Sequence, residues 1–367
     1  MVTEALPGTH ERARDGDSKP TAIDLFSGCG GLTSGLKKAG FRVLGAVDVD
    51  PLSVSTYKAN HRDVVVWRRD IRRLRPSTLL RRLGLKQGEL DLLAGCPPCQ
   101  GFSRMRTLNG AKQVDDPRNR LLFEFFRFVK KIRPRAVMIE NVPGLADDEC
   151  FGDFCSKMKD LGYLGDYIVL NAADYGVPQR RRRLIYLAGL GVKVPFGRKA
   201  RKIRTVQDAI GGLPKAGYSG DPLHDMPEHR IPRVMELIHR IPKDGGSRTG
   251  LPKEFQLECH KRCTGFKDVY GRMAWNEVAP TITSGCFNPS KGRFLHPEED
   301  RAITMREAAL LQGFQRRYRF PSSSKVGVAS MIGNALPPPF IAAHSKSIRR
   351  VLEKQRLRSV GRILNRG

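Results

Sequence analysis

The chain has 367 residues, of which 40% are hydrophobic and 28% charged, and its formal net charge is +28 at pH 7. These proportions exclude a fibrous or wholly disordered chain, and the length favours one large domain with a smaller companion. The charge makes a polyanion the expected partner, and no uninterrupted apolar run approaches the roughly 18 residues that span a bilayer, so we predict a cytoplasmic protein without a membrane partner.

Strand-like and helix-like segments alternate through the first half of the chain. Strands are predicted over 21–28, 41–50, 64–67, 89–95, 136–142, 167–172 and 183–189, and helices over 31–40, 51–60, 120–132 and about 149–160. This alternation predicts an α/β fold with a doubly wound, mostly parallel sheet.

The pattern changes at about residue 191 to short irregular segments rich in Pro, Gly and basic residues. A helix is predicted over 304–314, because Thr304 and Glu307 have the spacing of a capping box, and a basic helix follows 333–340. We therefore predict a disordered tail over 1–18, a large domain over 19–190, a smaller irregular domain over 191–324 and a return to the large domain over 325–367.

Glycines and acids stand where the first three strands end. DLFSGCGG (24–31) turns a strand into a helix, and backbone amides at such a turn can approach a cofactor closely, although the pattern is not GxGxxG. Asp48 and Asp70 follow the second and third strands, where they could accept hydrogen bonds from ribose and adenine. A nucleoside-containing cofactor is the favoured ligand, and ordinary turn residues are the alternative.

GCPPCQGFS (95–103) contains a Cys-x-x-Cys, which could be a metal clip, a redox pair, a buried thiol or a nucleophile with a bystander. Cys99 comes just after the strand 89–95, at the edge where open α/β sheets bind ligands, so the nucleophile is favoured. No metal is predicted, because the other cysteine pairs are distant in sequence and poorly spaced. The strand 136–142 should deliver Glu140 to the same edge, where burial would raise its pKa and let it donate a proton.

Six motifs stand in the order and spacing of one known family. DLFSGCGG, PPCQGFS, ENVPG, QRRRR, TMREAALLQGF and IGNALPPP resemble those of the DNA cytosine-5 methyltransferases, over about residues 20–345. The resemblance implies a Rossmann-like, S-adenosylmethionine-dependent methyltransferase fold with a target-recognition region, here about 191–270.

The resemblance also implies a role for each catalytic residue. Cys99 would add to carbon 6 of a flipped cytosine, Glu140 would protonate ring nitrogen 3, Arg183 would bind the base carbonyl and Arg181 would brace the site. The cofactor-binding residues implied are Phe26, Gly28, Gly30, Asp48, Asp70, Ile71 and Asn334. The candidate DNA contacts are Gln100, Ser103, Arg104 and Arg106, in a segment (100–120) that resembles the family's mobile loop; solvated charge is the alternative for the two arginines.

The predicted activity is that of a DNA (cytosine-5-)-methyltransferase (EC 2.1.1.37), acting as a monomer on double-stranded DNA. A bacterial restriction-modification role beside a cognate restriction endonuclease is favoured. A tRNA-directed enzyme of the same fold and a catalytically silent DNA-binding subunit are the alternatives. Two departures from the family pattern, Cys96 and Cys29, raise the question of sensitivity to oxidation.

Overall fold

The computed structural model describes residues 19–98, 121–255 and 267–364, and its first half forms a seven-stranded sheet in the order β3-β2-β1-β4-β5-β7-β6. The strands are β1 (Thr21–Leu25), β2 (Arg42–Asp48), β3 (Val65–Arg68), β4 (Leu92–Gly95), β5 (Ala136–Asn141), β6 (Tyr163–Asn171) and β7 (Arg182–Leu190). Strands β1 to β5 pair in parallel, whereas β7 is antiparallel to both β5 and β6. The predicted doubly wound, mostly parallel α/β sheet is confirmed.

The reversal at β7 was not predicted and matters for the site. A parallel connection needs a crossover of a dozen or more residues, usually helical. Residues 172–181, which join β6 to β7, contain only the short 3₁₀ turn η5 (Ala172–Tyr175), so the chain turns back. As a result β7 begins at Arg182 beside the place where β5 ends, since Asn141 pairs with Leu184.

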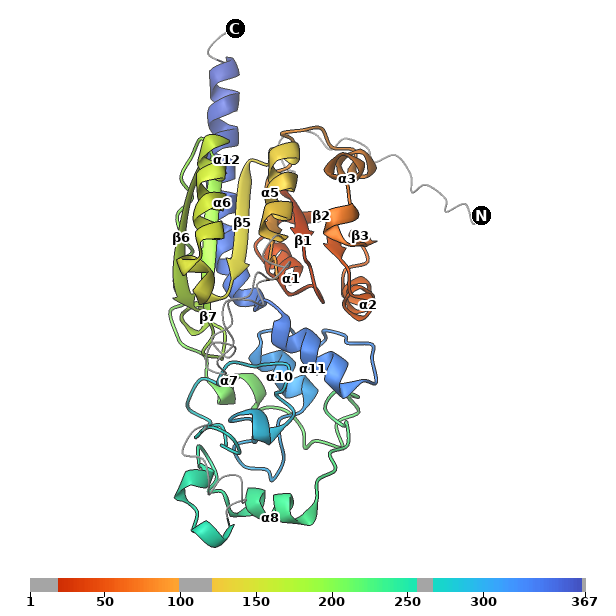
Figure 1. Cartoon of the computed structure of the whole chain (residues 1–367), viewed down its shortest axis with the longest axis vertical. Coiled ribbons are helices and arrows are strands. Elements are labelled where there is room, and N and C mark those ends of the chain that lie inside the picture. Colours follow the sequence, from red (N-terminus) through yellow and green to blue (C-terminus); the bar gives the residue numbers. More distant parts are fainter. Residues whose placement is uncertain (1–18, 99–120, 256–266, 365–367) are drawn as a thin grey trace, which may run out of the picture.

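Helices cover both faces of the sheet (Figure 1). One face is covered by α1 (Gly31–Lys38), α2 (Pro51–Asn60) and α12 (Pro338–Leu364), whose core includes Leu36, Tyr57 and Ile341. The other face is covered by α3 (Pro76–Leu83), α5 (Leu121–Ile132) and α6 (Glu149–Asp160), with Phe125 and Phe154 in its core. The C-terminal helix α12 lies against α1, so the last part of the chain packs on the first.

One segment among the described residues, Lys325–Arg358, is long and apolar enough to cross a membrane by length and composition alone. Its most apolar window is 67% buried inside the protein, and the segment consists of two helices, α11 (Lys325–Asn334) and α12. We interpret it as part of the protein core.

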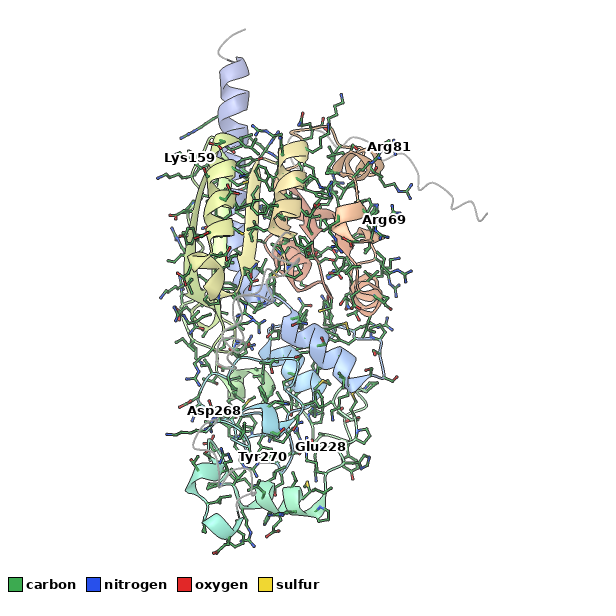
Figure 2. All side chains as sticks on the ribbon, viewed as in Figure 1. Arg69, Arg81, Lys159, Glu228, Asp268 and Tyr270 are labelled. Carbon is green, nitrogen blue, oxygen red and sulfur yellow. The ribbon has the colours of Figure 1, made fainter. Side chains whose placement is uncertain are left out.

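The chain between β7 and α12 is largely irregular and has a core of its own. Its helices are α7 (Val206–Ile210), α8 (Pro232–Arg240), α10 (Met305–Leu311) and α11, and only α10 was predicted. The capping box is confirmed, since Thr304 Oγ1 accepts from Glu307 N and the Glu307 carboxylate accepts from Thr304 N. Figure 2 shows Asp268 and Tyr270 in this irregular part, whereas Arg69 and Arg81 lie on the sheet-bearing part.

A buried arginine holds the far end of this irregular part together. Arg272 has no exposed surface, and its guanidinium donates to the carbonyls of Ile238, Ile241, His296 and Glu299 at 2.7–3.0 Å and pairs with Asp300. One side chain thus satisfies carbonyls at the end of α8 and in the loop before α10, groups that burial would otherwise leave unpaired.

Replacing Arg272 with methionine is expected to destabilise the irregular part by about 3–5 kcal/mol, because several buried carbonyls lose their donor and the Asp300 carboxylate loses one of its partners, keeping Lys243 and His239. Urea unfolding followed by the fluorescence of Trp275, in the same part, measures the change. Lys199→Met removes a single exposed ion pair with Asp174 and should cost less than about 1 kcal/mol. Equal effects of the two substitutions would contradict this role for Arg272.

Candidate active site

Two of the predicted catalytic side chains, Glu140 and Arg183, lie together at one edge of the sheet. Strand β4 ends at Gly95 and leads into Cys96, and its neighbour β5 ends with Glu140 and Asn141. Because β7 is antiparallel to β5, its first residues, including Arg183, start at this same edge. Ligands of open α/β sheets bind at the carboxyl ends of the strands, so this is the expected place for a site.

Glu140 is buried, with 1% of its surface exposed, and two side chains contact its carboxylate. Arg183 Nε lies 3.0 Å from Oε1, and the Cys96 thiol donates to Oε2 at 3.1 Å. Burial raises the pKa of Glu140 above its usual value, while Arg183 and Arg181 oppose that shift. The carboxyl is therefore suited to hold a proton and to release it to a partner.

The arginines of QRRRR divide between the interior and the surface. Arg181 is buried, and Nη1 donates to Ile282 O at 3.0 Å and Nη2 to Gly333 O at 2.8 Å. Burial lowers the pKa of Arg181 to about 9, and its Nε has no hydrogen-bond partner among the described residues. Arg180 and Arg182 are exposed, and Arg183 lies between these extremes beside Glu140. Arg181 is thus fixed to the backbone on either side, at Ile282 and Gly333.

The predicted nucleophile and DNA contacts lie outside the described residues: Cys99, Gln100, Ser103, Arg104 and Arg106. The chain leading to them is held in place, because Asn141 Nδ2 donates to Pro97 O at 2.9 Å. Asn141 itself is 3% exposed, and its Oδ1 accepts from Val142 N. Sequence reasoning assigned Asn141 no role, although a buried amide at the end of a predicted strand was a usable signal.

The predicted cofactor residues in the turn between β1 and α1 lie together. We call residues 26–31 the cofactor loop. Three of its residues, Phe26, Gly28 and Gly30, have positive φ angles of 60°, 51° and 99°. Gly28 N donates to Asp48 Oδ2 at 2.7 Å, and Asp50 N donates to Oδ1 at 2.9 Å. The loop therefore depends on Asp48 for its shape, and burial raises the pKa of that carboxyl.

The remaining predicted cofactor residues differ in their surroundings. Ile71 is 4% exposed, in the core beneath the end of β3. Asp70 caps the 3₁₀ turn η1 (Ile71–Arg73), and Arg72, 2.5 Å away, lowers the pKa of its carboxyl. Asn334 is exposed at the end of α11. The residue before it, Gly333, accepts from Arg181. Two residues after it, the Leu336 carbonyl oxygen lies so near Gly31 that a Cβ there would be 2.4 Å away.

Two further observations correct or extend the sequence prediction. Cys29 is 2% exposed, and burial raises the pKa of its thiol to about 12, so it lacks the exposed thiolate that oxidation requires. Gln179, which was assigned no role, is fully buried; its amide donates to Gln312 Oε1 at 2.7 Å and accepts from Ile282 N at 2.9 Å. It joins the start of β7 to the irregular part.

Comparisons with known proteins agree with this architecture. The family model described as C-5 cytosine-specific DNA methylase matches residues 21–350. A relative from Herpetosiphon aurantiacus, the Type II methylase M.HgiDII, is 37% identical and aligns over 92% of this chain and 98% of its own length. The Type II methyltransferase M1.HphI of Haemophilus parahaemolyticus is 33% identical and aligns over 89% of this chain and 86% of its own length.

Solved structures show the same fold. A crystal structure titled as a DNA modification methyltransferase encoded within an Escherichia coli prophage has a TM-score of 0.68 at 26% identity, covering 91% of this chain and 99% of that one. The S. pombe Dnmt2 methyltransferase is 19% identical with a TM-score of 0.59, and the match covers 92% of this chain and 99% of that one. At this identity the likeness supports the fold alone.

The fold and the site together define a methyltransferase of the Rossmann-like class. The chain belongs to the C-5 cytosine-specific DNA methylase family, and its activity is that of a DNA (cytosine-5-)-methyltransferase, as the sequence predicted.

Proposed function

We propose that this protein methylates carbon 5 of cytosine within one specific duplex DNA sequence, through a flipped base and a covalent bond between Cys99 and the cytosine. The observation that carries this proposal is the buried Glu140, held between Arg183 and the Cys96 thiol at the edge where the chain leads to Cys99. A target cytosine can reach such an edge only outside the helical stack, which costs a few kcal/mol.

Each catalytic residue acts on one atom of the base. The Cys99 thiolate adds to carbon 6, and the electron pair freed from the ring makes carbon 5 nucleophilic. Glu140 donates its proton to ring nitrogen 3, which removes the negative charge that the addition would otherwise place there. Arg183 binds the base carbonyl while Arg181 holds the surrounding backbone. Once carbon 5 carries the methyl group, loss of the carbon 5 proton to solvent expels the Cys99 thiolate. Ring nitrogen 3 returns its proton to Glu140, and the aromatic ring is restored.

The cofactor loop suits S-adenosylmethionine, which supplies the methyl group when bound. A Cβ on Gly28 would meet no atom within 4 Å, so a ligand can lie directly against the backbone there. Phe26 would stack on its adenine, Asp48 accept from its ribose, Ile71 and Asp70 frame the adenine, and Asn334 and Gly30 approach its methionine part. The Asp70 carboxylate already contacts exposed Arg72, so we expect it to contribute least.

The irregular part supports recognition of DNA. Residues about 191–270 supply target recognition in this proposal, and the exposed basic run Arg198 to Arg204 lies at its start. We assign the large domain to 19–190 and 325–367 and the small one to 191–324; α11, at the start of the last segment, also packs against α10 of the small domain. We further propose a cytosolic monomer that acts as the modification enzyme of a restriction-modification system or as an orphan equivalent. Its relatives named Type II methyltransferases support that role.

Methyl transfer from labelled S-adenosylmethionine to duplex DNA and to tRNA, measured side by side, tests the substrate. We expect label in duplex DNA, confined to 5-methylcytosine, and none in tRNA. Label in tRNA alone would favour the RNA-directed alternative. Tight cofactor binding without transfer to either substrate would favour the silent subunit.

Replacing Cys96 with alanine is expected to move the alkaline limb of the pH–rate profile to higher pH. The Cys96 thiol donates to Glu140 Oε2 and so stabilises the ionised carboxylate; without it the pKa of Glu140 rises further and the acid stays protonated to higher pH. Cys96→Ser retains a donor and should keep a near-native profile. Identical profiles for the alanine variant and the wild type would mean that Cys96 does not influence the pKa of Glu140.

A further inference from the structure

We propose that Tyr318 and His61 are positioning residues that hold the cofactor loop in its binding conformation, so that the irregular part of the chain sets the affinity for S-adenosylmethionine. This inference rests on the proposed binding of that cofactor to residues 26–31. Neither residue was singled out by the sequence, and neither belongs to the cofactor-binding set described above.

Tyr318 holds one carbonyl of the cofactor loop, and His61 holds the Tyr318 hydroxyl in turn. The Tyr318 hydroxyl donates to Cys29 O at 2.5 Å, and His61 Nε2 lies 3.1 Å from that hydroxyl and 3.3 Å from Gly30 O. Because Tyr318 uses its proton on Cys29, the hydroxyl oxygen is the acceptor for an Nε2–H of His61. Burial lowers the pKa of His61 to about 4, so the ring is neutral at physiological pH.

Fixing the direction of a carbonyl restricts the conformation of the loop. A peptide unit is planar, so the direction of each carbonyl also sets the direction of the next residue's amide. Tyr318, supported by His61, therefore orients the Cys29–Gly30 peptide unit, which leads into α1. The next carbonyl, Gly30 O, accepts from Ser34 N and Ser34 Oγ, both at 2.9 Å. A Cβ on Gly30 would lie 2.6 Å from the Tyr318 hydroxyl oxygen and 2.7 Å from His61 Nε2, so this packing also explains the glycine.

We call Tyr318 and His61 the clamp, and both side chains are held rigidly. Tyr318 is 7% exposed, and its ring lies 4.6 Å from that of Phe314 and 5.4 Å from that of Phe320. His61 is 5% exposed, with its ring 4.8 Å from that of Tyr57. Packed rings of this kind leave little rotamer freedom, so the hydroxyl and imidazole stay where the loop needs them.

The clamp is anchored in the irregular part. Tyr318 follows α10, and Arg306 of that helix donates to Tyr318 O at 2.9 Å. The next residue exchanges two hydrogen bonds with the end of α2, since Asn60 Nδ2 donates to Arg319 O at 2.7 Å and Arg319 N donates to Asn60 Oδ1 at 2.9 Å. Cys29 joins the same core as Phe314 and Phe320. The loop is thus shaped from both parts of the protein.

Tyr318→Phe removes only the hydroxyl and is expected to weaken the binding of S-adenosylmethionine by about tenfold, in the full chain, by titration calorimetry. At saturating cofactor kcat should remain within about twofold of the wild type while KM for the cofactor rises, since the reacting residues are untouched. His61→Ala, an independent variant, should weaken binding in the same direction.

Tyr163→Phe is the matched control. Tyr163 is also buried and donates to a backbone carbonyl, that of Pro134, at 2.7 Å, but it packs in the core between the sheet and α5 and α6, whereas Tyr318 packs in the core of the irregular part. It should bind the cofactor as the wild type does. If Tyr318→Phe and His61→Ala also bind like the wild type, the positioning role is overturned and the proposed function stands. If the wild type does not bind the cofactor, the proposed function itself fails.

Discussion

Cys99→Ser is expected to reduce methyl transfer to background, a loss of at least about 10⁴-fold, while duplex DNA still binds. A thiol ionises within reach of neutral pH, whereas a serine hydroxyl does not, so the variant lacks a nucleophile able to add to carbon 6. The covalent step can be observed directly on DNA with 5-fluorocytosine at the target position. Fluorine cannot leave carbon 5 as the proton does, so the Cys99–cytosine adduct should accumulate and survive denaturing electrophoresis.

Cys150→Ser is the control for this experiment, because Cys150 is an exposed thiol on α6 that has no part in the proposed mechanism. It should form the adduct at the wild-type rate, and Cys99→Ser should form none. Normal turnover by Cys99→Ser, or an adduct in that variant, would refute the covalent mechanism.

Glu140→Gln is expected to lower kcat by about 10²–10⁴-fold, with affinities for cofactor and DNA within about threefold of the wild type. Glutamine has nearly the same shape, and its one carbonyl oxygen can still meet Arg183 while the amide nitrogen faces the Cys96 sulfur, but it has no acidic proton to transfer to ring nitrogen 3. Single-turnover rates at saturating cofactor and DNA isolate the chemical step from binding.

The pH dependence of the rate tests whether Glu140 acts as the acid. The protonated acid is the active form, and burial raises the pKa of Glu140, so activity should be retained up to a higher pH than an ordinary glutamate would allow and fall as pH rises through that raised pKa. Glu140→Gln should lose this alkaline limb along with its rate. If Glu140→Gln had the wild-type kcat, or kept the same alkaline limb of the pH–rate profile, Glu140 would not be the acid.

The sequence predicted the site best where strand order alone decides the outcome. Asp48 and Glu140 lie at the ends of parallel strands and Cys96 directly follows one, and parallel strands end at the same edge, so periodicity sufficed to place all three at that edge. The capping box at Thr304 was equally local, because both of its hydrogen bonds join residues three positions apart. Predictions of this kind need no knowledge of the tertiary packing.

The rest depended on contacts between residues far apart in the chain. The antiparallel direction of β7 follows from the lack of a crossover helix, yet it puts Arg183 beside Glu140. Gln179 with Gln312, and Tyr318 with Cys29, are separated by more than 130 residues, and no periodic pattern marks either pair. In the irregular part, α7, α8 and α11 have only five, nine and ten residues, which is too short for a helical period to stand out, and they were missed.

The measurement that tests the central claim most directly is methylation sequencing of genomic DNA from a methylation-free host that expresses this protein, beside the same host expressing Cys99→Ser. We expect 5-methylcytosine in one short sequence context with the wild type and none with the variant. Folded wild-type protein that leaves the genome unmethylated, or equal methylation by the variant, would contradict the account.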